Sequence, residues 1–426
     1  MQVLSLIDQR TTSNGSPNLS RPYLEEAQSI AVDICKDAVW YQDMCNWIGQ
    51  EHDHQGSSSP QLISTNLNGS LYDGTTGVAL FLASVYKLWK EEIVCDTAKG
   101  AMRHALGATQ MILESPHGLG YWNGALGTYL TSCQLATMLE AEEFLEIGLT
   151  GVENILTSPI HPDFEYDILG GAAGSITALL KHRHLCTRKI IDLLDKYLLE
   201  LGARLLDSAT TTARGTCWVS NHSPGPPLLG YGHGNSGCIH ALLELYDFFG
   251  DQNYFDVALH TLEYENDFFD ANEQNWPDLR STPDDIEGQP KFMNAWCHGA
   301  VGIGLSRLRS YEITGNDVFL HDAKICLQKA EEQIDFKKVS ACLCHGVSGN
   351  SDLLIEGTRV LQDQAFLKKA KTIGSEGIEK IAGKGDHWIN GLQNKVSIPG
   401  LMNGLSGIGY FYLRLAEPNL FKSVLL

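Results

Sequence analysis

Two kinds of apolar stretch alternate along the chain. The first kind is amphipathic and carries apolar side chains at positions i, i+3, i+4 and i+7, as in YLEEAQSIAVDICKDAV at 23–39 and FLHDAKICLQKAEEQI at 319–334. The second kind is apolar on all sides, as in GVALFLASVY at 77–86. A repeat close to 3.6 residues predicts an α-helix, and a helix that is apolar all round must be buried. The pattern therefore predicts pairs of helices, one facing solvent and one inside.

A Gly-x-x-Gly element begins each of the fully apolar stretches. It occurs seven times, and the distance from one first glycine to the next ranges from 47 residues (124 to 171) to 65 residues (234 to 299). A period of this length is typical of repeat proteins, in which each repeat is one supersecondary unit. The seven pairs are Gly74/Gly77, Gly124/Gly127, Gly171/Gly174, Gly234/Gly237, Gly299/Gly302, Gly346/Gly349 and Gly404/Gly407.

The repeat unit that these patterns predict is a helical hairpin: an outer amphipathic helix, a loop, the glycine pair and an inner apolar helix. Because seven apolar inner helices cannot form a layer exposed to water, we expect an all-α fold in which the hairpins close into a double ring, an α/α toroid. An open superhelix is the alternative. Glycine at the start of the inner helix would allow a positive φ in the turn, and its missing side chain would let neighbouring helices approach closely.

Two intervals between glycine pairs, residues 205–234 and 265–294, are longer than most of the others and contain prolines and many polar residues. We expect both to be long loops over the end of the ring at which the inner helices begin. Residues 1–20 and 51–70 are rich in Ser, Asn and Gly, which favours flexible segments. The predicted organisation is a flexible N-terminal segment at 1–20, followed by a single toroid domain at 21–426.

Composition excludes some classes of function. The chain has 426 residues and a formal net charge of −20. Proteins that bind nucleic acid or anionic membrane surfaces need a basic surface, so this charge argues against either as the main partner. No apolar run reaches the length of a transmembrane helix, and the N-terminus lacks the basic and apolar regions of a signal peptide. The 11 cysteines are an odd number without the dense spacing of a secreted scaffold, so we expect free thiols and a cytoplasmic location. A monomer is the default expectation.

The residue before the first glycine suggests chemistry in three consecutive repeats. It is histidine at His233, His298 and His345, and in the last two repeats Cys297 and Cys344 precede it. If the loops converge at the centre of the ring, Cys297, Cys344 and His345 can meet around one ion. Two thiolates and one imidazole suit Zn²⁺, and three firm ligands leave the fourth tetrahedral position for water or substrate, as in catalytic zinc sites. The sequence therefore predicts a catalytic zinc site.

Other interpretations of these residues stay open on the sequence alone. His298 could be a fourth ligand and close a structural Cys₂His₂ site. Cys342 could compete with Cys344, although it breaks the register of the repeat. His233 could bond to backbone at the start of its helix, and Asp167, which precedes the third glycine pair, could cap the third inner helix.

With its seven glycine pairs and the sequences WCHG at 296–299 and CHG at 344–346, the chain resembles the LanC-like family of lanthionine cyclases. The resemblance runs from about the first repeat to the C-terminus. The WCHG form and the ending GLMNGLSGIGYFYLRLAEPNLFKSVLL are most similar to the C-terminal cyclase domain of bifunctional class II (LanM-type) synthetases. The large N-terminal dehydratase region of those proteins is absent, so we expect either a stand-alone cyclase or an excised domain.

The resemblance implies an α/α toroid with a central zinc held by Cys297, Cys344 and His345. It places the family's proposed acid and base on His233, in the matching His-Gly-x-x-Gly, and on Asp167, in the matching Asp-x-x-x-Gly. These roles agree with the chemistry of the residue types, because imidazole titrates near neutral pH and a carboxylate can orient it.

The chain departs from the nisin-type cyclases of the family at two positions. Those cyclases carry an arginine four residues before the first zinc cysteine and a tyrosine directly after that cysteine. This chain has Met293 and His298 at the two positions, and Lys291 is nearby but out of register. His298 is a further candidate proton donor, and the role of the arginine must be filled differently or not at all.

The function that the resemblance implies is zinc-dependent cyclisation of lanthipeptides. A cysteine thiol of a dehydrated precursor peptide, bound with its leader, would add to dehydroalanine or dehydrobutyrine in the same peptide and form a lanthionine or methyllanthionine ring. A dehydratase partner or a fused dehydratase domain would supply the dehydrated residues. Two alternatives use the same fold: addition of glutathione to dehydrated proteins, and a non-catalytic toroid that binds a peptide and uses zinc as a structural clip.

Overall fold

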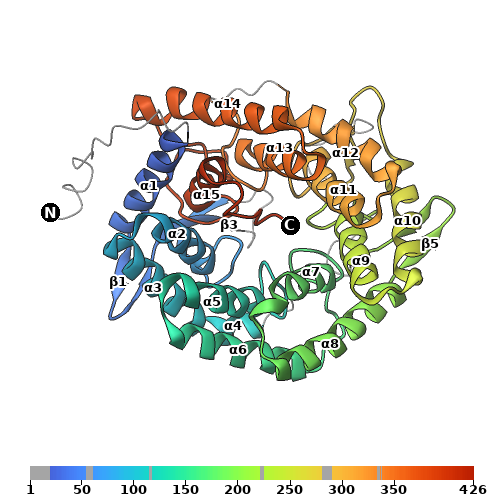
Figure 1. Ribbon diagram of the computed structural model, residues 1–426, viewed down its shortest axis with the longest axis horizontal. Coiled ribbons are helices and arrows are strands. Elements are labelled where there is room, and N and C mark those ends of the chain that lie inside the picture. The colour runs from blue at the N-terminus through green and yellow to red at the C-terminus, as the bar shows by residue number, and fades with distance from the viewer. Residues whose placement is uncertain are drawn as a thin grey trace.

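The computed structural model describes residues 20–53, 61–114, 118–220, 225–280, 290–332, 336 and 338–426. The expectation of a flexible segment at 1–20 falls almost wholly outside these residues. The described chain is a closed double ring of helices, an α/α toroid, as Figure 1 shows. The first helix packs against the last inner helix, so the repeats close on themselves and the alternative of an open superhelix is wrong.

In the part of the chain that the structure describes, seven inner helices surround the centre of the ring, and seven outer helices cover them (Figure 1). The inner helices are α2 (Thr75–Trp89), α5 (Ala125–Leu139), α7 (Ala172–His182), α9 (Asn235–Phe249), α11 (Ala300–Thr314), α13 (Val347–Leu361) and α15 (Leu405–Ala416). The outer helices are α1 (Arg21–Lys36), α3 (Glu92–Gly107), α6 (Glu142–Thr157), α8 (Arg188–Asp207), α10 (Gln252–Asn266), α12 (Asp317–Ala330) and α14 (Gln364–Lys380). The predicted hairpins are therefore present, in the predicted order.

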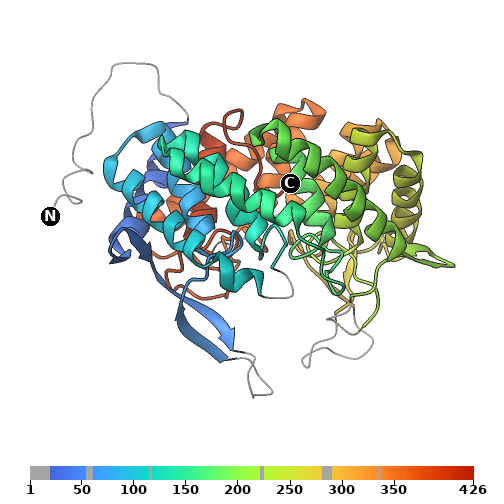
Figure 2. The same ribbon diagram turned by 90° about the horizontal axis from the view of Figure 1, so that it is seen from below.

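Short elements decorate the ring. Helix α4 (Thr109–Leu113) and the 3-10 turns at Arg183–Leu185 and Ala382–Lys384 extend connections between helices. The described residues also contain four antiparallel strand pairs: β1 (Val39–Tyr41) with β2 (Met44–Asn46), β3 (Ile48–Asp53) with β4 (Gln61–Asn66), β5 (Thr210–Thr212) with β6 (Gly215–Cys217), and β7 (Pro277–Asp278) with β8 (Lys291–Phe292). Figure 2 shows β3 and β4 projecting from one end of the ring. The expectation of a flexible stretch at 51–70 is wrong for β4, because its backbone pairs with β3 from Gln61 to Asn66.

Each inner helix is preceded by a loop that ends at the first glycine of its pair, called a glycine loop below. Backbone hydrogen bonds join the seven glycine loops into a closed circuit at one end of the ring. Each loop donates a main-chain N–H to the carbonyl of the next loop, and the last loop returns to the first. The bonds are Tyr72 N to Trp122 O, Trp122 N to Leu169 O, Ile168 N to Gly232 O, Gly232 N to Cys297 O, Trp296 N to Cys344 O, Cys344 N to Met402 O and Met402 N to Tyr72 O, with lengths from 2.7 to 3.2 Å. The circuit holds residues from distant repeats at fixed distances from one another.

The glycine pairs are required mainly because their missing side chains allow close approaches. A Cβ on the second glycine of each pair would lie 1.8–2.5 Å from the carbonyl oxygen six residues earlier, as with Gly127 and Tyr121 O, because the loop folds back over the first turn of its own helix. The close approach is thus to the same loop in every pair. At Gly77, Gly237 and Gly302 a side chain of the neighbouring repeat also lies 2.5–2.6 Å from the added Cβ, which agrees with the expected approach of neighbours. The first glycines have extended backbones except Gly299, whose φ of 83° makes it the one member that needs glycine for conformation.

Two fully buried arginines tie neighbouring helices together. Arg307 of α11 pairs with Glu265 of α10 at 2.7 Å, and with Asp322 of α12 at 3.2 Å. Arg414 of α15 pairs with two carboxylates of α13, Asp352 and Glu356. A buried charge is tolerated only with such partners, so each arginine fixes how its helices pack.

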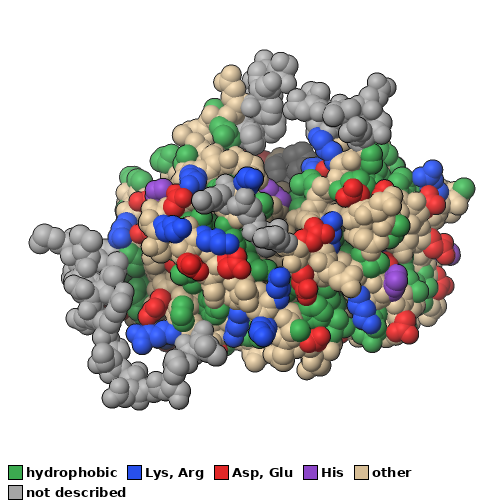
Figure 3. All heavy atoms as spheres, turned by 90° about the horizontal axis from the view of Figure 1, so that it is seen from above, with side chains coloured by type: hydrophobic (Ala, Val, Ile, Leu, Met, Phe, Trp, Pro, Cys, Tyr) green, Lys and Arg blue, Asp and Glu red, His purple; other side chains and the backbone are tan. Residues whose placement is uncertain are grey.

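No helix among the described residues is long and apolar enough to cross a membrane. Acidic and basic side chains are interspersed on the face drawn in Figure 3, and no extended patch of either sign covers it. The negative net charge of the chain is therefore not gathered on this face.

Candidate metal centre

Three predicted ligands meet where the glycine loops converge. Cys297 comes from the loop before α11, and Cys344 and His345 come from the loop before α13. The sulfurs of the two cysteines and one ring nitrogen of the histidine all lie within 4.8 Å of one another. Tetrahedral Zn²⁺ with Zn–S bonds of about 2.3 Å separates two sulfurs by about 3.8 Å, so these donors fit the ion in type and in spacing.

His345 is oriented by a main-chain carbonyl. Its Nε2 lies 2.7 Å from Gly391 O, and a carbonyl can only accept, so Nε2 carries the proton. Nδ1 is then the nitrogen left on the side of the sulfurs, where the ring hydrogen-bonds Cys297 and where its lone pair would bind an ion. A metal-binding histidine commonly donates its other N–H in this way, which sets the tautomer and the angle of the ring.

The two cysteine sulfurs are electrostatically incompatible as an isolated pair of anions. A hydrogen bond from Cys344 holds the pKa of Cys297 well below its usual value, against the effect of burial, and the nearby rings of His345 and His298 add to this lowering. The same contact and burial raise the pKa of Cys344 well above its usual value. Without a cation one sulfur therefore carries the negative charge, and a divalent cation would allow both sulfurs to ionise.

His233 and Asp167, predicted as acid and base, are in direct contact. Nδ1 of His233 lies 2.7 Å from Oδ2 of Asp167, while the other carboxylate oxygen of Asp167 accepts the N–H of Gly170 at 2.9 Å. Burial opposes the charged imidazole, but the hydrogen bond and the charge of Asp167 raise the pKa of His233 overall. Asp167 therefore orients His233 in addition to bracing its own loop, and it does not cap α7, which begins after Gly171.

His298 lies beside this pair with an unusual environment. Its side chain is buried, and both ring nitrogens lack a hydrogen-bond partner among the described residues. Its ring centroid is 6.2 Å from that of His233, and its Nδ1 is 3.9 Å from Oδ1 of Asp278. Its nitrogens are not among the described donor atoms that gather within 4.8 Å of one another, so the geometry does not favour a fourth ligand from His298.

Cys342 stays outside the cluster of donors. It is fully buried, and its sulfur accepts the backbone N–H of His345 at 3.4 Å. Burial raises the pKa of this thiol to about 11, so it is protonated at neutral pH. Cys342 thus supports the loop that carries the candidate ligands Cys344 and His345, which agrees with its position out of register.

Comparison with known proteins settles the family. The model of the lanthionine synthetase C-like protein family matches residues 65–426. The chain belongs to the lanthionine synthetase C-like family. The lacticin 481/lactococcin biosynthesis protein LcnDR2 of Lactococcus lactis subsp. lactis is 23% identical over 380 residues, which cover 84% of this chain and 37% of that protein. This lanthionine synthetase C-like chain therefore spans well under half the length of that relative.

The fold of this lanthionine synthetase C-like chain is also that of a solved structure. Nisin cyclase superposes with a TM-score of 0.60 at 20% sequence identity, over 82% of this chain and 89% of nisin cyclase. At this identity the likeness shows the shared toroid. The expected family and the expected fold are both confirmed.

Arg280 is a functional candidate that the sequence pattern did not reveal. It lies beside Met293, the position at which the resemblance implied an arginine, with 3.8 Å between Nη2 and the methionine sulfur. Asp278 holds the guanidinium at 2.6 Å, and the charges of Cys297 and Cys344 help to raise the pKa of Arg280. A cation is therefore present near the sulfurs, but it comes from the long interval at 265–294, where no repeat register marks it.

Tyr72 is a second residue that the pattern did not single out. Its hydroxyl oxygen lies 2.9 Å from the sulfur of Cys344. It belongs to the first glycine loop, 272 residues away from Cys344 in the chain. Only ring closure brings the two together.

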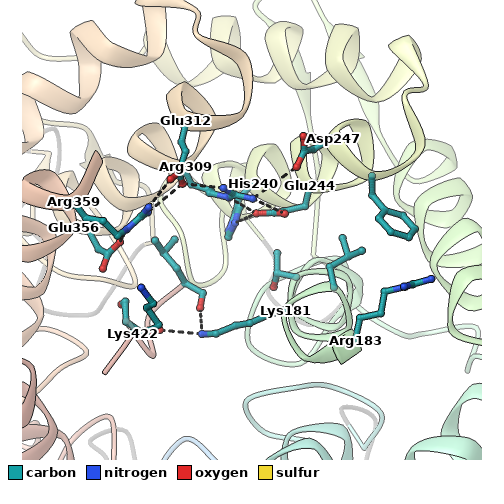
Figure 4. Close-up of a pocket in the computed structure, with 15 residues that line it drawn as sticks. Lys181, Arg183, His240, Glu244, Asp247, Arg309, Glu312, Glu356, Arg359 and Lys422 are labelled. Atoms are coloured by element: carbon teal, nitrogen blue, oxygen red, sulfur yellow. Dashed lines mark hydrogen bonds and ion pairs between the residues drawn. The ribbon is translucent and has the colours of Figure 1, made fainter. Parts of the chain in front are cut away.

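A separate cavity lies at the opposite end of the ring, where the inner helices end. It has a volume of about 530 Å³ and is lined by α7, α9, α11, α13 and the C-terminal residues. Figure 4 shows several of its charged side chains paired with one another, as Arg309 is with Glu244 at 2.6 Å and Arg359 with Glu356 at 2.8 Å. Lys181 donates to the carbonyl of Ser423 at 2.9 Å. The cavity is thus lined by a network of ion pairs and lies away from the cysteine cluster.

Proposed function

We propose that this chain is a zinc-dependent lanthipeptide cyclase. Cysteine thiols of a dehydrated precursor peptide would add to dehydroalanine or dehydrobutyrine of the same peptide and form lanthionine or methyllanthionine rings. The observation that carries the proposal is the gathering of Cys297, Cys344 and His345 within 4.8 Å, next to the His233–Asp167 pair. Zinc held by these three ligands would supply a Lewis acid that lowers the pKa of the substrate thiol at its free fourth position.

His233 is the proposed proton donor. As the sulfur–Cβ bond forms, the π electrons of the dehydrated residue move toward its carbonyl oxygen, and the resulting enolate needs a proton at Cα. The pKa of His233 is raised by Asp167, so the imidazolium is populated nearer neutral pH and can give that proton. The proton lost by the substrate thiol can then restore the imidazolium, which balances the reaction.

Arg280 is the proposed stabiliser of the enolate oxygen. A fixed cation beside a developing negative charge lowers the energy of the transition state more than that of the ground state. Asp278 holds the guanidinium in place through several hydrogen bonds from Nε and Nη2. The side chain is 41% exposed, so the remaining N–H groups can reach a bound peptide.

The substrate and partners of this proposal follow from the reaction. The dehydrated residues must be made beforehand, so a dehydratase, as a partner or as a fused domain, has to act on the same precursor. We propose that the precursor peptide binds together with its leader. The relative LcnDR2, which extends well beyond the matched residues, is named as a biosynthesis protein for lacticin 481 and lactococcin.

The experiment is a thiol count on a dehydrated, cysteine-containing precursor peptide. Zinc-loaded protein is incubated with the peptide, remaining thiols are alkylated, and mass spectrometry counts the labels. Each ring leaves the peptide mass unchanged and removes one label, and Cys297→Ala should leave every thiol free. If wild-type protein with bound zinc also leaves every thiol free, the proposal is wrong.

The same assay separates the two alternatives. Glutathione added to the reaction would appear as an increase in peptide mass if the protein used an external thiol. A toroid in which zinc is only a structural clip would retain the metal and produce neither rings nor adducts. A reaction without protein measures spontaneous ring formation.

A further inference from the structure

We propose that Tyr72 is a positioning residue of the metal centre, whose hydroxyl hydrogen-bonds the sulfur of Cys344 and protects this ligand from alkylation by the electrophilic substrate. The inference rests on the proposed cyclase function, since that reaction places an electrophilic alkene beside two protein thiolates. The proposed role of Tyr72 differs from the roles of the metal ligands and of the His233–Asp167 pair, because it determines which sulfur reacts with the alkene.

The contact between Tyr72 and Cys344 is short and aimed at the sulfur. The hydroxyl oxygen lies 2.9 Å from Sγ, and the cysteine is 2% exposed. A phenol has an ordinary pKa of about 10, so it carries its proton at neutral pH, while a metal-bound cysteine has none. The hydroxyl therefore donates and the sulfur accepts.

Tyr72 is held so that its hydroxyl cannot swing away. Its ring centroid lies 6.2 Å from that of Trp122 and 6.4 Å from that of Trp296. Its backbone N–H donates to Trp122 O at 3.0 Å, and its carbonyl accepts from Met402 N at 2.8 Å. The carbonyl of Met402 in turn accepts the N–H of Cys344 at 3.0 Å, so one residue clamps the backbones of donor and acceptor to each other.

The two cysteine ligands differ in this respect. Cys344 receives the Tyr72 hydroxyl, whereas no hydrogen-bond donor outside the proposed ligands is described for the sulfur of Cys297. Cys297 lies instead near the imidazole rings of His298 and His345. The Tyr72 O–H group therefore reduces the charge density on the sulfur of Cys344 and leaves that of Cys297 unchanged.

The side reaction that this contact would suppress is clear chemically. If Cys344 attacked the β-carbon of a dehydrated residue, a new sulfur–carbon bond would form, the π electrons would move to Cα and its carbonyl, and a proton from solvent or His233 would complete the adduct. Cys344 would become a thioether and the substrate would stay attached. A hydrogen bond draws electron density from the sulfur and so lowers its nucleophilicity, leaving the substrate thiolate as the better nucleophile.

The test compares Tyr72→Phe with the wild-type chain, both loaded with zinc. Acrylamide serves as a small, neutral Michael acceptor, and mass spectrometry follows the alkylation of Cys344 with time. Removal of a hydrogen bond to a charged group should speed alkylation of Cys344 about tenfold or more. Tyr121→Phe is the matched control, because it removes a hydroxyl from the same aromatic cluster, 5.5 Å from Trp122, without contact to either sulfur among the described atoms. Its Cys344 should react like that of the wild type.

A cobalt-substituted sample gives a readout that does not depend on reactivity. Loss of the hydrogen bond makes the thiolate more electron-rich, so the sulfur-to-cobalt charge-transfer band should move to longer wavelength in Tyr72→Phe and stay in place in Tyr121→Phe. Equal alkylation rates and equal bands in Tyr72→Phe and the wild type would overturn the inference. Loss of the metal from Tyr72→Phe would also overturn it, because the hydroxyl would then serve metal retention.

The outcome can be separated from that of the cyclase proposal. A chain that forms rings but shows no Tyr72 effect refutes only the protective role. If Tyr72→Phe shows faster Cys344 alkylation and the shifted band but the wild-type chain forms no thioether rings, the cyclase proposal is refuted. The effect of the hydrogen bond on the thiolate is then still supported.

Discussion

Nδ1 of His233 lies 2.7 Å from Oδ2 of Asp167, although 66 residues and one complete helical hairpin separate them. The contact exists because the third and fourth glycine loops are neighbours in the hydrogen-bonded circuit, where Ile168 N donates to Gly232 O. It gives the histidine a fixed orientation and a raised pKa close to the donors of the candidate metal centre.

Asp167→Asn should move the pH dependence of ring formation. The protonated form of His233 is the proposed acid, so the rate should fall as pH rises through the pKa of His233. Asparagine removes the negative charge that raises this pKa, and the fall should then begin at lower pH. Rates of ring formation across pH 5–9 measure this, and an unchanged alkaline limb would contradict the assignment of His233.

The same pair makes a pH-dependent contribution to stability. Because the pKa of His233 is raised on folding, this contribution is fully present below the unfolded pKa of about 6.5 and is lost as pH rises through the folded pKa. Urea unfolding of the wild type and Asp167→Asn should therefore show a difference that shrinks over this range. A difference that grows with pH would exclude the linkage.

Metal content should separate the proposed ligands from their neighbours. Wild-type protein is expected to hold about one zinc per chain, and Cys297→Ala should lose it because two ligands hold the ion poorly. His298→Ala should keep it, since the His298 nitrogens lie outside the cluster of donor atoms. Plasma mass spectrometry of purified protein gives the count. Loss of zinc in both variants would instead indicate a closed four-ligand site.

Arg280→Met should slow ring formation by about 10- to 100-fold without loss of zinc, because it removes the proposed stabilising cation and no ligand. Arg183→Met is the matched control, since that arginine pairs with Asp195 near the ends of the inner helices and lies away from the cysteines. Single-turnover rates on the dehydrated peptide make the comparison. Equal rates for Arg280→Met and the wild type would remove Arg280 from the mechanism.

Gly127→Ala should lower the free energy of unfolding of the toroid by about 1–3 kcal/mol, because the new methyl group would meet the Tyr121 carbonyl oxygen at 1.8 Å. Gly107 of α3 offers the control, as a Cβ there meets no atom within 4 Å. Gly107→Ala should be neutral or stabilising by up to about 1 kcal/mol, the difference in helix propensity. Urea unfolding monitored by circular dichroism measures both. A stable Gly127→Ala protein would show that the loop can retreat from its helix.

The architecture could be read from the sequence to a large extent. The amphipathic and fully apolar stretches correspond to the outer and inner helices, and the seven glycine pairs mark the starts of the inner helices. Closure of the ring followed from the need to bury seven apolar helices. Helical periodicity and loop signals are local properties, so a sequence carries them directly.

The three candidate ligands were also accessible from the sequence. Cys297 and Cys344 occupy equivalent places in successive repeats, and His345 directly follows Cys344. Equivalent places in a closed ring face the same centre, where the structure gathers these three residues. The role of the glycines was predicted less well. The expected positive φ occurs only at Gly299 among the first glycines, because the other loops reach their helices through extended backbone.

The remaining features depend on the tertiary structure alone. Arg280 comes from an interval without a repeat register, and Tyr72 reaches Cys344 only because the first loop and the sixth loop meet through Met402. The orientation of His345 is set by the Gly391 carbonyl. Periodicity along the chain determined which elements form and which candidate ligands share a register. The directions of single side chains depend instead on contacts between segments that the closed circuit of loops brings together.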